Sequence, residues 1–549
     1  MRIRTINHRL GHGRGYESLL LVLLLAVSLA CAPAGGGGDA VSPGDAIATT
    51  TAGQLQGAFE DGLYVFRGVP YGASTAGAGR FKPPKPRAAW GGVRDAIVFG
   101  PICPQEGSVA TGQGSDATVG FIEKLPQSED CLVLNLWTPG LDDGRRPVMV
   151  WLHGRGYSQG AGSEGWYDGT ELAESGDVVV VTINHRLNVF GYLHLAELGG
   201  EDFAGSGVAG MLDAVLSLEW VRDNIAEFGG DPSRVLLFGE SGGGAKVSTM
   251  LALPSGEGLF HRAVIQSGPS LRATEPEGAT AIAERLLVRL GLRADELSEL
   301  QQVPFEKVTE AIGRVSDDEE GGPLGFRPVL DSQYFPNHPF DPVAAPSSVG
   351  VAVMIGSNRD ESALFSTGDA ARGTMDEDEL MTRAERILGD RKDAVVEVYR
   401  EQRPEATPWD LYTAISSERT RLASIQLAES QAAASDQPVY MYLFDWETDF
   451  GDGLYKACHA LEIPFVFNHP DLVPLTGSLP GQEELAEEMS QAWIAFARSG
   501  DPNHPGLPQW DPYDAERRAT MVFDTESQAV DDPRREERLA WEGIGPRRF

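Results

Sequence analysis

A glycine-rich pentapeptide at the end of an apolar run is the feature that most limits how this 549-residue chain can fold. Residues 235–238 read Val-Leu-Leu-Phe and lead directly into Gly239-Glu240-Ser241-Gly242-Gly243. Glycines on both sides of Ser241 allow a sharp turn, because side chains there would collide with neighbouring backbone. The small residues of the segment 243–250 favour a helix after the turn. The pattern predicts a strand, a tight turn with Ser241 at its tip, and a helix.

Other apolar runs place this turn in an alternating pattern. Residues 148–152, 178–183 and 351–355 predict buried strands, and residues 211–228 have apolar side chains at helical spacing. Residues 53–71 predict short strands separated by glycine turns. Strands that alternate with helices favour the α/β class, with a central, mostly parallel sheet flanked by helices. Ligands of such sheets bind at the carboxyl ends of the strands.

The N-terminus predicts export. Four arginines precede an apolar run at 19–29, which is the layout of a signal peptide and is too short to span a bilayer as a helix. We therefore interpret 1–30 as a signal peptide, 31–48 as a glycine-rich tether and 49–549 as a single domain. Cys31 is a lipidation candidate, which predicts membrane attachment as a lipoprotein of a bacterial cell envelope. Cleavage after Ala30 by ordinary signal peptidase predicts a periplasmic or secreted protein instead.

Charge and cysteine content narrow the choice of partners. The chain carries 80 Asp plus Glu against 45 Lys plus Arg, a formal net charge of −35. Such a surface repels phosphate backbones and argues against general nucleic-acid binding. Only four cysteines occur, and in an exported chain Cys103 and Cys131 are the natural local pair for a disulfide. No feature of the sequence indicates a particular oligomeric state.

Candidates for acyl-transfer chemistry lie at the ends of the predicted strands. The loop His153-Gly154-Arg155-Gly156-Tyr157 follows the strand at 148–152, where backbone N–H groups can meet that of Gly242 at a developing oxyanion. A base that follows both Ser241 and the acid in the chain leaves His459, His469 and His504. We favour His459 because it lies on a loop after a strand predicted at 439–446. The acid follows the strand at 351–355, where spacing leaves Asp360 and Glu361 both open.

The chain resembles the type-B carboxylesterase and cholinesterase family nearly from end to end. The resemblance rests on motifs that occur in the right order: Phe66-Arg67-Gly68-Val69-Pro70-Tyr71, Glu129-Asp130-Cys131-Leu132, Phe228-Gly229-Gly230-Asp231-Pro232, Phe238-Gly239-Glu240-Ser241, Gln266-Ser267-Gly268, Asp360-Glu361, His459-Ala460-Leu461-Glu462-Ile463-Pro464-Phe465 and Gly500-Asp501-Pro502-Asn503. It implies an α/β-hydrolase fold, with inserted loops and helices that form an active-site gorge.

The resemblance also assigns roles to individual residues. It implies that Ser241 is the nucleophile, His459 the base and Glu361 the acid. It further implies a disulfide between Cys103 and Cys131. Three more residues match a serine beside the catalytic histidine and two glutamates of a buried acidic network, namely Ser267, Glu240 and Glu462.

The chain departs from the family pattern at three places. Gly242 stands where the family usually has alanine, and Arg155 replaces the second glycine of the oxyanion loop. One explanation of Arg155 is an allowed loop conformation with a solvent-facing side chain. The other is a guanidinium at the gorge mouth that binds substrate carboxylates. The segment between Cys103 and Cys131 also lacks the tryptophan that holds choline in cholinesterases, which argues against choline esters.

These observations predict a serine carboxylesterase that acts on a small-molecule ester through an acyl-enzyme, with no metal or organic cofactor. Two alternatives use the same scaffold. A hydrolase of a carbamate, amide or lactone shares all of this machinery, and a non-catalytic binding protein shares the fold. The joint presence of Ser241, Glu361 and His459 argues against the second alternative.

Overall fold

The structure is a computed structural model that describes residues 46–106, 125–313 and 324–544. The predicted signal peptide, most of the predicted tether and the lipidation candidate Cys31 lie outside these residues. The first described strand, β1 (Ile47–Thr49), begins two residues before the predicted start of the domain at 49. No described helix is long and apolar enough to cross a membrane.

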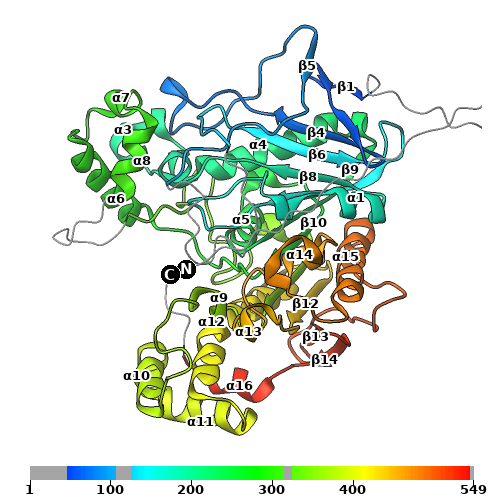
Figure 1. The fold of residues 1–549 in the computed structure, drawn as a ribbon. Helices are drawn as coiled ribbons and strands as arrows, with labels where there is room; N and C mark the ends of the chain where they lie inside the picture. Colours follow the sequence, from blue (N-terminus) through cyan, green and yellow to red (C-terminus); the bar gives the residue numbers. More distant parts are fainter. Residues whose placement is uncertain (1–45, 107–124, 314–323, 545–549) are drawn as a thin grey trace, which may run out of the picture. The chain divides into compact units, whose positions relative to one another are not determined.

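Eleven described strands form one large sheet, and its central seven strands are parallel (Figure 1). Antiparallel strands complete both edges. The strand order, from edge to edge, is β14 (Gln528–Asp531), β13 (Ala519–Phe523), β12 (Val439–Phe444), β11 (Ala352–Asn358), β10 (Arg262–Gln266), β9 (Gly230–Glu240), β7 (Arg146–Leu152), β8 (Val179–Ile183), β6 (Val133–Thr138), β4 (Leu63–Pro70) and β3 (Ala58–Glu60). A small second sheet contains β1, β2 (Gln54–Gln56) and β5 (Val93–Asp95).

Two hydrophobic layers cover the faces of the large sheet. Along β7, the side chains of Val148, Val150 and Leu152 belong to one layer, and those of Met149 and Trp151 belong to the other. This alternation is the two-residue period of a strand buried on both faces. The first layer includes α4 (Ala209–Asn224), α5 (Gly242–Met250) and α12 (Pro408–Ala434), and the second includes α1 (Thr170–Gly176), α14 (Ile463–Val466) and α15 (Gln482–Ser499).

Smaller helices form two further groups, each around its own hydrophobic cluster (Figure 1). The first group contains α2 (Asn188–Tyr192), α3 (Ala196–Gly199), α6 (Pro276–Leu290), α7 (Leu297–Leu300) and α8 (Phe305–Gly313). The second contains α10 (Glu377–Leu388), α11 (Lys392–Gln402) and α16 (Arg535–Ala540). Two short helices, α9 (Ser362–Phe365) and α13 (Phe450–Gly453), lie next to the candidate site in the sequence.

The predicted strands and helices are confirmed, with shifted ends. The strand predicted at 235–238 is the last part of β9, which begins at Gly230, and the one predicted at 351–355 is β11. The helix predicted at 211–228 is α4 followed by a 3-10 turn over Ile225–Phe228. The order of strands reverses at β7, which lies between β8 and β9. Such a reversal opens a crevice at the carboxyl ends of the strands, where the loop after β7 and the turn after β9 meet.

Candidate active site

Ser241 sits at the tip of the tight turn between β9 and α5. Its backbone has φ 55° and ψ −119°, a conformation that is strained for a residue with a side chain. The turn is held by hydrogen bonds from Ser241 N to Gln266 O at 2.8 Å and from Ala245 N to Ser241 O at 2.9 Å. A Cβ atom on Gly243 would lie 1.9 Å from Leu152 O, so only glycine fits there. The sequence pattern predicted this turn correctly.

A cavity of about 1110 Å³ opens beside Ser241. Its wall includes Gly156 of the loop after β7, Gly242 at the start of α5, and Ser267 after β10. Three strand ends therefore converge on one space, as expected for the crevice of a parallel sheet. The hydroxyl of Ser267 is buried and has no hydrogen-bond partner among the described residues.

His459 and Glu361 lie together although they are far apart in the sequence. His459 Nδ1 is 2.5 Å from Glu361 Oε2, and both residues are buried. The other carboxylate oxygen, Oε1, accepts a hydrogen bond from Asn358 N at 2.9 Å. Because the backbone at the end of β11 holds the carboxylate, Glu361 can orient the imidazole through its Nδ1.

The structure separates the two acid candidates that spacing had left open. Asp360 Oδ2 accepts a hydrogen bond from Arg359 Nε at 2.7 Å and lies within 3.4 Å of Ala457 N, so it is engaged away from the imidazole. Of the other histidine candidates, His504 contacts the carbonyl oxygen of Glu488. Only Glu361 and His459, of the acid and base candidates, are brought together.

The second ring nitrogen of His459 faces another carboxylate. Nε2 lies 3.2 Å from Glu240 Oε1, and the hydrogen bonds that Ser241 forms with other described residues are made by its backbone. Contact between the Ser241 hydroxyl and Nε2 therefore requires a reorientation of side chains. Catalytic hydrogen bonds are often long or poorly aligned in unliganded enzymes and tighten when substrate binds.

Carboxylates dominate the electrostatics around His459. Burial opposes the charged imidazolium, but Glu240, Glu361 and Glu462 outweigh burial and raise the pKa of His459. Burial, partly offset by His459, raises the pKa of Glu240 well above its usual value. Burial and the Glu361 charge raise the pKa of Glu462 to about 7. Glu462 accepts hydrogen bonds from Asn358 Nδ2 at 2.7 Å and Gln266 Nε2 at 3.3 Å, so it is fixed in place.

The conformation of Arg155 differs from the first sequence-based explanation. Its φ is 62°, in the left-handed region that favours glycine, and its Nε donates to Glu164 Oε2 at 3.3 Å. The expectation of an ordinary conformation with a solvent-facing side chain is therefore wrong. The alternative, a guanidinium at the gorge mouth, gains no support, because Arg155 is not among the residues that line the cavity. The ion pair with a buried carboxylate offsets the strained backbone.

Gly242 and Gly156 are in close backbone contact. A Cβ atom on Gly242 would lie 2.2 Å from Gly156 O and 2.3 Å from Gly156 N. An alanine at 242 would therefore push the loop away from the turn. This contact explains why glycine stands at position 242, where the family that the chain resembles usually has alanine. The same contact places the amide of Gly156 beside the start of α5.

Among the described residues, no cluster of three or more His, Cys, Asp or Glu side chains is placed to bind a metal ion. The family model for the Carboxylesterase family matches residues 44–541. The chain belongs to the carboxylesterase family. The expected α/β-hydrolase fold is confirmed by the sheet and by the solved structures that it matches.

Individual relatives agree with this assignment. The para-nitrobenzyl esterase of Bacillus subtilis is 36% identical over 90% of this chain and 97% of its own length. The phenmedipham hydrolase of Pseudarthrobacter oxydans is 35% identical over 88% of this chain and 96% of its own length. A crystal structure of a Geobacillus stearothermophilus carboxylesterase is 40% identical, covers 90% of this chain and all of its own, and superimposes with a TM-score of 0.78. The protein is a carboxylic ester hydrolase.

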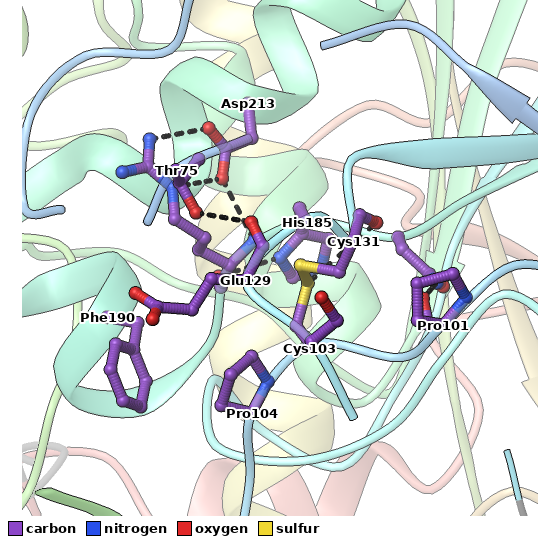
Figure 2. The surroundings of a disulfide bond; sticks show 12 residues. Thr75, Pro101, Cys103, Pro104, Glu129, Cys131, His185, Phe190 and Asp213 are labelled. Atoms are coloured by element: carbon purple, nitrogen blue, oxygen red, sulfur yellow. Dashed lines mark hydrogen bonds and ion pairs between the residues drawn. A yellow bond between two sulfur atoms is a disulfide. The ribbon is translucent and has the colours of Figure 1, made fainter. Parts of the chain in front are cut away.

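The carboxylesterase carries the expected disulfide between Cys103 and Cys131. His185 and Glu129 are among the residues that surround it (Figure 2). Glu129 is paired with Arg80 at 2.5 Å, and Arg186, next to His185, is paired with Asp213 at 2.6 Å. The Arg186 pair fixes the backbone next to His185, and the Glu129 pair fixes the segment that leads into Cys131.

One charged residue of this carboxylesterase was missed by the sequence reasoning. Lys246 on α5 is fully buried, and its Nζ donates to His153 O at 2.8 Å, at the base of the oxyanion loop. A signal for it exists in the sequence. A lone lysine inside a helix of small and apolar residues, directly after the Ser241 turn, is unusual because lysine is almost never fully buried.

Proposed function

We propose that this carboxylesterase hydrolyses esters through an acyl-enzyme on Ser241. His459 removes the hydroxyl proton as Ser241 attacks the ester carbonyl, and then returns it to the leaving alcohol. Water attacks the acyl-enzyme by the same route. The observation that carries the proposal is the 2.5 Å contact between His459 Nδ1 and Glu361 beside a strained serine turn that opens into the cavity.

Backbone amides are proposed to stabilise the tetrahedral oxyanion. The N–H groups of Arg155, Gly156 and Gly242 belong to the loop after β7 and to the first turn of α5. The close approach of Gly156 to Gly242 supports this role, because it brings two of the three donors to one place. Preorganised donors of this kind stabilise charge as it develops and need little rearrangement.

Small-molecule carboxylic esters are the substrates that the family implies. The family match and the esterase relatives favour this bond over the carbamate, amide and lactone alternatives and over a non-catalytic role. We propose that choline esters are poor substrates, because no tryptophan lies between Cys103 and Cys131 to bind a quaternary ammonium. A series of p-nitrophenyl esters of increasing acyl length, with acetylthiocholine added, tests this preference.

The nucleophile is tested with Ser241→Ala and a matched control. Loss of the hydroxyl should reduce kcat to a residual activity of about 10³–10⁴-fold over the uncatalysed reaction in water. Substrate binding and the oxyanion donors sustain this residual activity. An organophosphate should label wild-type enzyme once per chain and leave Ser241→Ala unlabelled. Ser270→Ala removes another hydroxyl from the cavity wall and should keep near-wild-type turnover. Turnover in Ser241→Ala close to that of the wild type would remove the basis of the proposal.

The N-terminal assignment is a separate proposal about location. Cys31 is proposed to carry lipid after removal of residues 1–30, which holds the enzyme at the bacterial cell envelope; without lipid, the exported enzyme is periplasmic or secreted. The support is the order of arginines, apolar run and small residues before Cys31. Wild-type enzyme should partition into detergent, and Cys31→Ala should not. An unmodified mature N-terminus at Cys31, found by mass spectrometry, would contradict lipidation.

A further inference from the structure

Lys246 places a cation beneath the oxyanion loop. It lies on α5, five residues after Ser241 in the sequence, and its side chain is fully buried. Its ammonium hydrogen-bonds to the carbonyl oxygen of His153, the first residue of the loop, at 2.8 Å. It also lies 5.8 Å from the ring centroid of Tyr157, the last residue of the loop. One side chain therefore contacts both ends of the five-residue segment.

A buried ammonium without an ion pair is costly to the fold. Within the described ranges, Lys246 forms no ion pair, and Glu164 attracts it only at longer range. Burial lowers the pKa of Lys246 to about 7, and Glu164 acts in the opposite direction. A hydrophobic residue of similar volume would avoid this cost. The ammonium form is present at and below about neutral pH, and packing alone does not account for a lysine at this position.

The neighbouring titratable groups leave the positive charge to Lys246 and Arg155. The rings of His153 and His185 stack at 4.7 Å. Burial, reinforced by Lys246, lowers the pKa of each ring well below its usual value, which disfavours the imidazolium form of both. Arg155 is paired with Glu164. The loop is thus held by an arginine–glutamate pair at Arg155 and by an ammonium at the His153 carbonyl.

We propose that Lys246 is a positioning residue for the oxyanion loop: its ammonium holds the His153 carbonyl so that the following amides face the oxyanion, and its charge favours that anion. The inference rests on the proposed acyl-enzyme mechanism. A hydrogen bond to an ionised donor is stronger than a neutral one, so it restrains the loop firmly. In a water-excluded site, the same charge acts on the oxyanion with little screening.

A trifluoromethyl ketone separates this role from simple packing. Ser241 Oγ adds to the ketone carbon, its proton passes to His459, and the ketone oxygen becomes an anion held by the loop. The corresponding secondary alcohol binds the same cavity with no charge on oxygen. In Lys246→Met, which keeps the volume and loses the charge, ketone affinity and kcat should fall together by about 10–10²-fold, less than the loss of one direct oxyanion donor. Affinity for the alcohol and KM should change by less than about threefold.

Two further variants keep the test decisive. Val247→Ala shortens an adjacent buried side chain of α5 that faces the core, and should lower Tm while ketone affinity stays near wild type. If Lys246→Met does not fold, Lys246→Leu carries the same test, because it also removes both the donor to His153 O and the charge. Unchanged ketone affinity in a folded, uncharged variant would overturn the proposal, and so would an equal loss for ketone and alcohol. Failure of the acyl-enzyme mechanism would show separately, as equal affinities for ketone and alcohol in the wild type.

Discussion

The two sides of Ser241 are built from opposite charges. On the side of the base, Glu361 and Glu240 lie within 2.5 and 3.2 Å of the His459 ring nitrogens, and Glu462 lies behind them. On the side of the oxyanion loop, Lys246 and Arg155 contact the loop or form part of it. The first arrangement favours a positive imidazolium after proton transfer, and the second favours a negative oxyanion. The difference shows that the site is polarised along the direction in which charge separates during acyl transfer.

The largest effect is expected on the base side, from Glu361→Gln. Glutamine offers no charged oxygen to accept the hydrogen bond from His459 Nδ1. The imidazole therefore loses the carboxylate that orients it and stabilises its cationic form. We expect kcat to fall by about 10³–10⁴-fold, as for an amide in place of a triad carboxylate. Asp360→Asn is the matched control and should mainly lower Tm, because Asp360 pairs with Arg359. If Asp360→Asn cost as much in kcat as Glu361→Gln, the acid would be misassigned.

On the oxyanion side, Gly242→Ala should have the next largest effect. The added Cβ would lie 2.2 Å from Gly156 O, so the loop must move away from the turn. We expect kcat to fall by about 10²–10³-fold, the cost of losing one oxyanion donor, with a smaller change in KM. Gly278→Ala in α6 is the control, because a Cβ there meets no atom within 4 Å. Activity of Gly242→Ala within twofold of wild type would show that the contact with Gly156 can relax freely.

Arg155→Gly tests whether the arginine serves the loop or the substrate. Because its guanidinium is bound to Glu164, its loss should loosen the loop and leave Glu164 unpaired. We expect kcat/KM to fall by about tenfold for a neutral ester and for a hemi-ester with a free carboxylate alike, in the range for one charge-assisted hydrogen bond. A loss confined to the hemi-ester would instead show that Arg155 binds the substrate carboxylate.

The smallest effect concerns pH. His459 must be neutral to act as the base, so kcat/KM is retained above its pKa and lost as pH falls through it. Because the carboxylates raise that pKa, the midpoint should lie above the ordinary value of about 6.5 for imidazole. Glu462→Gln removes one carboxylate and should move the midpoint down by up to about one pH unit. A profile that is flat between about pH 5 and 8 would contradict a histidine base.

The sequence predicted the base side of the site better than the oxyanion side, for physical reasons. Strands such as β7 and β9 are continuous apolar runs, and steric limits require the glycines around Ser241. The sequence pattern alone therefore predicted both the strands and the turn. His459 and Glu361 were found by chain order and resemblance, and the structure shows why Asp360 is excluded.

The oxyanion side depends on backbone geometry and buried charge, which leave weaker marks in the sequence. The positive φ of Arg155 could not be predicted, because arginine normally avoids that region and the Glu164 pair that supports it is a tertiary contact. Lys246 was missed because a lysine in a helix is usually solvent-facing. The approach of Gly156 to Gly242 explains an unusual glycine only once both loops are placed.

Rapid-quench mass spectrometry of the enzyme mixed with a p-nitrophenyl ester tests for the acyl-enzyme on Ser241. We expect a burst of p-nitrophenol equal to one per chain, and a single acyl group on the peptide that contains Ser241. The acyl group should be absent from Ser241→Ala. An acyl group on any other residue, or steady turnover with neither a burst nor a covalent adduct, would contradict an acyl-enzyme on Ser241.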